Sequence, residues 1–168
     1  MGLDVNTPAG EVTYQHELIA LNAMKTAYGL DLALTQRNSP CKVDGLLFRD
    51  GILMGIYETK CRYKLPVKTL QNSTYSNRWL VTFDKILAGL ELAQKLFVPY
   101  YGILYLVDEP DPDLRGHMVE IGDARGSLAV DIQVRRSETR ATVNGGLANR
   151  INAYILMDTA YQFRVEDV

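Results

Sequence analysis

The sequence has few of the residues that build zinc sites or disulfide frameworks. Among 168 residues there are two cysteines, Cys41 and Cys61, and two histidines, His16 and His117, which lie far apart along the chain. The spacing of these four residues does not match the Cys and His pattern of a structural zinc site. The cysteines have no secretory leader before them, which favours two reduced thiols over a disulfide.

Long apolar runs are also missing. The longest apolar stretches, such as residues 100–107, fall far short of the roughly 20 residues needed to cross a bilayer, so we expect no membrane partner. The first residues, "MGLDVNTPAGEVTYQHE", contain neither a basic leader nor an apolar signal core. A cytoplasmic location is therefore expected.

The chain as a whole has no large excess of one charge sign, but one segment does. The net charge of −2 excludes a global basic field for nucleic acid. The stretch 60–82 nevertheless holds five basic residues and no acidic one. These basic residues are Lys60, Arg62, Lys64, Lys68 and Arg78. The same stretch contains Pro66 and the polar run "QNSTYSN", which predicts a long basic loop that could hold a polyanion.

The apolar pattern predicts an α/β domain. We expect helices over 11–28 and 82–97 from their 3.6-residue period, and a buried strand over 101–108 from its continuous apolar run. Further strands are expected over 31–36, 43–48 and 52–60, the last two forming a hairpin. Beyond these, segments 117–121 and 128–134 read as strands of a β-rich C-terminal extension.

The hairpin carries charges that a core hairpin does not need. Glu58 and Lys60 are two residues apart and so point to the same side of a strand. A two-residue turn at Asp50-Gly51 would place Asp44 on the opposite face, whereas a three-residue turn with a left-handed Gly51 would place all three side chains together. We predict the three-residue turn, with the shared face turned toward the first helix.

Three acids would then meet at one buried place. The period of the first helix puts Glu17 on the stripe that faces the core, near Asp44 and Glu58. Unneutralised carboxylates there would be costly, and a hard divalent cation, Mg²⁺ or Mn²⁺, would resolve the conflict with oxygen ligands alone. Lys60 beside the metal would position or deprotonate an attacking water and neutralise charge on a phosphodiester.

This combination resembles the PD-(D/E)xK nuclease superfamily. The resemblance consists of Asp44, the triplet Glu58-Thr59-Lys60 on the next strand, and Glu17 on the preceding helix; Val43 stands where proline is common. It implies metal-dependent hydrolysis of DNA, with Asp44 and Glu58 as metal-binding acids, Lys60 as the catalytic lysine and Glu17 as an additional metal ligand. Whether cleavage is endo- or exonucleolytic stays open.

The resemblance also implies a domain organisation. We expect one domain over 1–168, with a restriction-endonuclease-like αβββαβ core over about 11–108 and the β-rich extension over about 109–168. The expected partner is DNA, and a homo-oligomer is compatible with the extension as a contact surface. The expected nucleic-acid-binding residues are Arg62, Lys64, Lys68, Arg78 and Lys85.

Each residue also has a structural interpretation. Glu17 could reach solvent at a helix edge, Asp44 could cap a strand, and Glu58 with Lys60 could form a solvated pair. Lys85, near the start of a buried helix, could approach the site, but an outward position with its ammonium group in solvent is favoured. For the whole chain, the alternative is a non-catalytic nucleic-acid-binding or assembly protein on the same fold.

Overall fold

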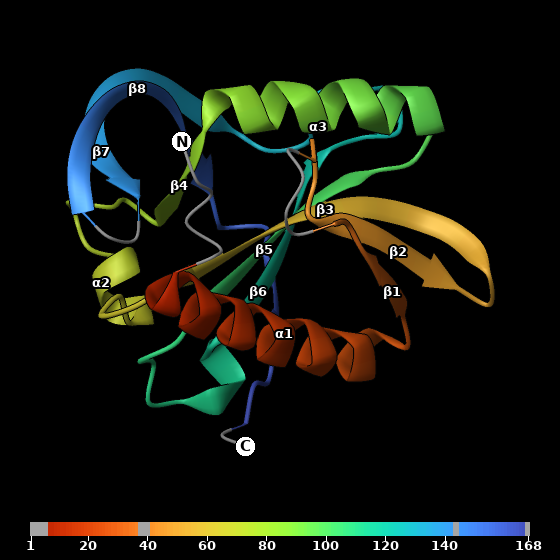
Figure 1. The fold of residues 1–168 in the computed structure, drawn as a ribbon, viewed down its shortest axis with the longest axis horizontal. Coiled ribbons are helices and arrows are strands. Elements are labelled where there is room, and N and C mark those ends of the chain that lie inside the picture. The colour runs from red at the N-terminus through yellow and green to blue at the C-terminus, as the bar shows by residue number, and fades with distance from the viewer. Residues whose placement is uncertain (1–6, 37–40, 143–144, 167–168) are drawn as a thin grey trace.

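The computed structural model describes residues 7–36, 41–142 and 145–166 (Figure 1). Its helices are α1 (Pro8–Tyr28), α2 (Val67–Leu70), α3 (Phe83–Leu96) and the 3₁₀ helix η2 (Pro112–Leu114). Its strands are β1 (Asp31–Leu34), β2 (Gly45–Arg49), β3 (Ile52–Arg62), β4 (Arg78–Thr82), β5 (Tyr100–Leu106), β6 (Gly116–Gly122), β7 (Ile132–Thr142), β8 (Gly145–Leu156) and β9 (Tyr161–Phe163).

A six-stranded mixed sheet forms the centre, in the order β1-β2-β3-β5-β6-β9. Strand β5 runs parallel to β3, and the other neighbours in this sheet are antiparallel. Helix α1 covers one face of the sheet and α3 covers the other (Figure 1). The predicted α/β class is therefore confirmed, and the expected order of helix, three strands, helix and strand is present with α2 and β4 inserted before α3.

Helix α1 begins one turn earlier than its apolar period indicates. The Thr7 side chain caps it by accepting a hydrogen bond from the Gly10 N–H at 3.1 Å, and Pro8 occupies the first helical position. Gly29 ends the helix in the left-handed conformation, at φ 61°. Leu21 and Met24 are buried against the sheet, so the predicted stripe faces the core.

The segment predicted as a long basic loop is interrupted by regular structure, and its polar run 71–77 is a series of turns. Strand β3 continues to Arg62, α2 follows, and β4 pairs antiparallel with β8 from Arg78 opposite Leu156 to Thr82 opposite Asn152. Trp79 of β4 is buried in the core that α3 covers. Strand β4 was not predicted, because its partner residues lie 70 to 78 positions further along the chain.

The C-terminal third is β-rich, as predicted, but it is divided between two sheets. Strands β6 and β9 complete the central sheet, whereas β7 and β8 form a long hairpin that pairs with β4 in a second sheet. In Figure 1 this hairpin curves beside the first turn of α3. Strands from beyond residue 108 therefore contribute to both sheets.

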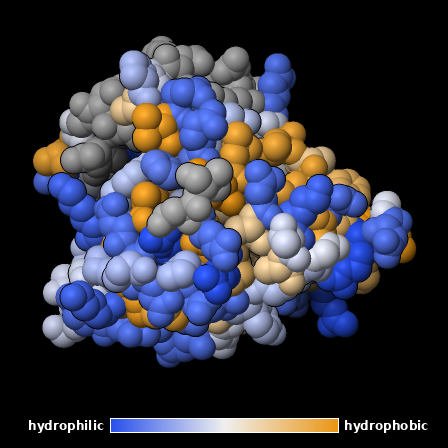
Figure 2. Space-filling model, turned by 90° about the horizontal axis from the view of Figure 1, so that it is seen from below, coloured by the Kyte–Doolittle hydropathy of each residue, from blue (hydrophilic) through white to orange (hydrophobic). Residues whose placement is uncertain are grey.

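The surface on the α1 side is largely hydrophilic (Figure 2). Hydrophobic side chains gather toward the end of the molecule that carries the β2–β3 turn. Ile52, the first residue after this turn, is exposed. No helix in the described part of the chain is long and apolar enough to cross a membrane.

Candidate active site

The β2–β3 turn differs from the prediction, yet it brings the same side chains together. Asp50 and Gly51 both have positive φ, 52° and 77°, as a two-residue type I′ turn requires, and Arg49 pairs with Ile52 across it. The predicted three-residue turn was wrong. Gly51 is left-handed as predicted.

An extra residue in β3 restores the shared face. Phe48 pairs with Leu53 and Leu47 pairs with Gly55, so Met54 is a β-bulge without a partner. Beyond the bulge Gly45 lies opposite Tyr57, which brings Asp44 level with Glu58. The extra residue in the strand places Asp44 on the same face as Glu58 and Lys60, which is the effect expected of an extra residue in the turn.

The face that carries Glu58 and Lys60 is covered by α3 and not by α1. Ile56 and Leu104, which share this face, pack in the same core cluster as Ile86 of α3. Tyr57 and Cys61, on the alternate positions of β3, pack in the cluster that contains the α1 residues. The predicted orientation toward α1 was wrong, because the side-chain period of two shows which residues share a face but not which helix packs on that face.

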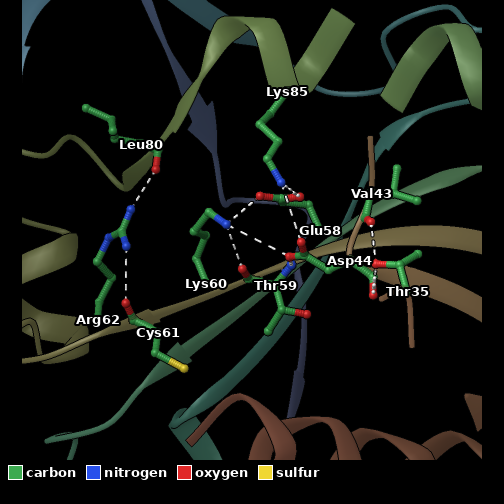
Figure 3. A network of polar contacts seen from close by, with 10 residues as sticks. All are labelled: Thr35, Val43, Asp44, Glu58, Thr59, Lys60, Cys61, Arg62, Leu80 and Lys85. Atoms are coloured by element: carbon green, nitrogen blue, oxygen red, sulfur yellow. Dashed lines mark hydrogen bonds and ion pairs between the residues drawn. The ribbon is translucent and has the colours of Figure 1, made fainter. Parts of the chain in front are cut away.

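Four charged side chains meet at this place (Figure 3). Lys60 Nζ contacts Glu58 Oε1 and lies 3.9 Å from Asp44 Oδ2. Lys85 Nζ, from the first turn of α3, lies 2.9 Å from Glu58 Oε2 and 3.5 Å from Asp44 Oδ1. Each ammonium therefore bridges both carboxylates, and we refer to Asp44, Glu58, Lys60 and Lys85 as the charge cluster.

Backbone groups hold Asp44 in position. Its N–H donates to Tyr57 O at 2.9 Å, and its Oδ2 accepts from the Thr59 N–H at 2.8 Å. The Thr35 N–H and hydroxyl both donate to the Asp44 carbonyl, each at 3.0 Å. Burial would raise the pKa of the Asp44 carboxyl, but Lys60, Lys85 and the Thr59 hydrogen bond hold it below its ordinary value. Asp44 is thus an oriented, ionised carboxylate.

Glu58 is the most buried member of the charge cluster. Its side chain is 0% exposed, whereas those of Lys60 and Lys85 are 27% and 36% exposed. Burial would lower the pKa of Lys60, but Glu58 and Asp44 raise it above its ordinary value. Lys60 is therefore an ammonium ion, which donates hydrogen bonds and does not accept a proton.

Glu17 approaches from the helix on the other side of the sheet. Burial raises the pKa of its carboxyl to about 7; the field of Lys60 opposes this shift, and Asp44 and Glu58 add to it. The Glu17 side chain is half-buried, on the core stripe as predicted. It therefore belongs to the electrostatic environment of the charge cluster.

The raised pKa of Glu17 predicts a pH-dependent stability. An unfolded chain releases this proton near 4.5 and the folded protein near 7, so the free energy of unfolding falls as pH rises through this window. We expect the Glu17→Gln variant to lack this contribution and to gain up to about 3 kcal/mol over the wild type between pH 4.5 and pH 8. Urea unfolding at both pH values measures it.

Glu11→Gln, at an exposed position of the same helix, is the control for the loss of one charge. Parallel stability curves for the wild type and Glu17→Gln across this pH range would show that Glu17 is not perturbed by the fold.

The donor set fits a hard divalent cation in part. Asp44 and Glu58 offer carboxylate oxygens that converge on two ammonium groups, and Mg²⁺ typically uses one or two carboxylates and keeps several waters. In the ranges 7–36, 41–142 and 145–166, no group of three or more His, Cys, Asp or Glu side chains is arranged around one point. Asp44 and Glu58 are therefore the pair that could hold such a cation directly, with Glu17 further out.

The residues predicted to bind nucleic acid fall into three groups. Arg62 donates to Leu80 O at 2.8 Å and Cys61 O at 3.1 Å, and so ties β3 to β4 (Figure 3). Arg78 is engaged with the Asp131 carboxylate and the Tyr154 carbonyl. Lys64 and Lys68 are exposed, on the segment between β3 and β4.

Lys85 is the fifth of these residues, and its ammonium group contacts the carboxylates of the charge cluster. Its ammonium reaches inward to Asp44 and Glu58 and not outward along the helix surface. The sequence left open an approach of Lys85 to the site but favoured an outward position, and the structure shows the approach. The available signal was its position one turn into an apolar helix, where a charge needs a partner.

Comparison with protein-family models, with curated proteins and with solved structures finds no match.

Proposed function

We propose that this protein is a nuclease that hydrolyses DNA phosphodiester bonds with Mg²⁺ or Mn²⁺, on a restriction-endonuclease-like core. The observation that carries this proposal is the convergence of Asp44, Glu58 and Lys60 where β2 meets β3. The mixed sheet supports it, with β5 parallel to β3 and one helix on each face.

Each residue of the charge cluster would have a separate role in hydrolysis. Asp44, held by the Thr59 N–H, and Glu58 would hold the cation. A bound divalent cation would lower the pKa of water and withdraw charge from the phosphoryl group. Lys60, as an ammonium ion, would orient the attacking water and stabilise negative charge that develops on the phosphate oxygens. Lys85 would balance the charge of Glu58 from the α3 side.

A second candidate is a nucleic-acid-binding or assembly protein without catalysis. The observation in its favour is that Lys60 and Lys85 already neutralise Asp44 and Glu58. Such a closed cluster needs no cation, and it would then serve the packing of α3 on the sheet.

A cleavage assay separates the two candidates. The wild type is incubated with linear, circular and branched DNA in Mg²⁺, in Mn²⁺ and in EDTA. Cleavage that requires the cation supports the nuclease, and nicking of closed circles identifies an endonuclease. DNA binding without cleavage in either metal supports the second candidate.

A further inference from the structure

A cavity of about 440 Å³ lies between the first turn of α3 and the β7–β8 hairpin, outside the charge cluster. Its size is within the range of ligand sites. Figure 1 shows the hairpin curving beside the start of α3. The lining residues are Thr82, Asp84, Arg136, Asn149, Arg150 and Ile151.

The hairpin wall of the groove is basic. Arg136 of β7 and Arg150 of β8 are both among the lining residues. Arg136 pairs with Ile151, so these two side chains share the face of the hairpin that turns toward α3, whereas Arg150 pairs with Ser137 and starts from the opposite face. The Arg136 side chain is exposed, and within the described ranges it makes no hydrogen bond or ion pair. An arginine that is already at a groove and has no carboxylate partner is available for an anionic ligand.

The opposite wall and the floor differ in chemistry. Asp84 is the acidic residue of the lining, at the start of α3, so a phosphate would lie against the hairpin wall. Asn149 offers an amide to sugar or phosphate oxygens, and Ile151, which is 46% exposed, offers an apolar surface to a sugar or base. A positive charge at Arg136 beside polar and apolar groups suits a phosphate and the sugar next to it.

The groove adjoins the charge cluster through α3. Asp84 lines the groove and the next residue, Lys85, contacts Glu58 and Asp44. The groove and the charge cluster therefore share the first turn of α3.

We propose that this groove binds the phosphodiester backbone of a nucleic-acid strand through Arg136, with Asn149 and Ile151 beside it. That the strand is then led to a hydrolytic site rests on the function proposed above, whereas the binding itself does not. The β7–β8 hairpin is thus a substrate-holding arm, and the segment 60–82 contributes less than its charge count indicates because Arg62 and Arg78 are engaged within the protein.

The test is binding of fluorescein-labelled single-stranded and duplex DNA, in EDTA so that cleavage does not interfere, over a series of salt concentrations. We expect Arg136→Gln to weaken DNA binding at least fivefold. The slope of log affinity against log salt concentration should become shallower by about 1, the amount that corresponds to one phosphate contact. Arg136→Lys should recover most of the affinity. Asp84→Asn should strengthen binding, because it removes the charge that repels phosphate.

The matched control is Arg125→Gln. Arg125 is also exposed, and its turn packs against α3 at Leu90 and Gln94, far along the helix from the groove. The proposal is overturned if the wild type binds neither DNA, if Arg136→Gln binds within twofold of the wild type, or if Arg125→Gln loses as much. The single-stranded and duplex series decide which form of DNA fills the groove.

This test fails separately from the cleavage assay. A protein that binds DNA through Arg136 but never cleaves it would keep the groove and reject the nuclease. If the wild type cleaves DNA and Arg136→Gln binds DNA as tightly as the wild type, the nuclease proposal stands and the groove proposal is rejected.

Discussion

The Lys60→Met variant is expected to cleave DNA at least about 100-fold more slowly than the wild type in saturating Mg²⁺. Lys60 Nζ lies at both carboxylates, and its pKa is raised, so it provides a fixed positive charge where a phosphate would react. Methionine keeps most of the side-chain volume and removes the charge. Single-turnover cleavage of a labelled duplex measures the effect.

The control for a general loss of positive charge is Lys68→Met, on the exposed surface of α2. It should cleave within a few fold of the wild type. Circular dichroism at the assay temperature establishes that both variants are folded. Cleavage by Lys60→Met at the wild-type rate would remove Lys60 from the proposed chemistry.

The Glu58→Ala variant is expected to be strongly destabilised. Its carboxylate is fully buried and is the shared partner of Lys60 and Lys85, so its loss leaves two neighbouring ammonium groups with Asp44 alone. Breaking a buried ion pair on one side costs about 3 kcal/mol or more. Chemical denaturation at pH 7 and low salt measures the change in the free energy of unfolding.

Two comparisons isolate the buried charge. The double variant Glu58→Ala, Lys60→Met should recover part of the lost stability, because it removes one of the two facing cations. Glu91→Ala should lose clearly less: Glu91 also contacts two lysines, Lys42 and Lys95, but its side chain is 48% exposed. Equal losses for Glu58→Ala and Glu91→Ala would contradict the cost assigned to burial.

Local patterns were sufficient to predict the elements that pack on the core. The apolar periods predicted α1 and α3 to within about a turn, and the continuous run predicted β5 as an interior strand. Strand β4 was missed because it depends on its pairing with β8, and the polar run before it resembles a loop. The hydrophobic period of a short segment does not show that the segment pairs with a strand so far along the chain.

The candidate site was predictable in composition but not in geometry. Asp44, Glu58 and Lys60 do meet, but through a bulge at Met54 and not through the turn, on the face of α3 and not of α1. The signal for the bulge was weak: Gly55, which follows Met54, packs so closely that a Cβ there would lie 2.8 Å from the Tyr101 ring. Lys85 joins them only through the docking of α3, which residue spacing along the chain does not specify.

Titration with Mn²⁺, followed by the electron paramagnetic resonance signal of the free ion, tests most directly whether the charge cluster is a cation site. We expect the wild type to bind Mn²⁺ at a site that competing Mg²⁺ empties, and Asp44→Asn to bind it at least about tenfold more weakly. Asparagine keeps the shape of Asp44 and removes its charge. A wild type that binds no Mn²⁺, or an Asp44→Asn variant that binds it equally well, would contradict the account.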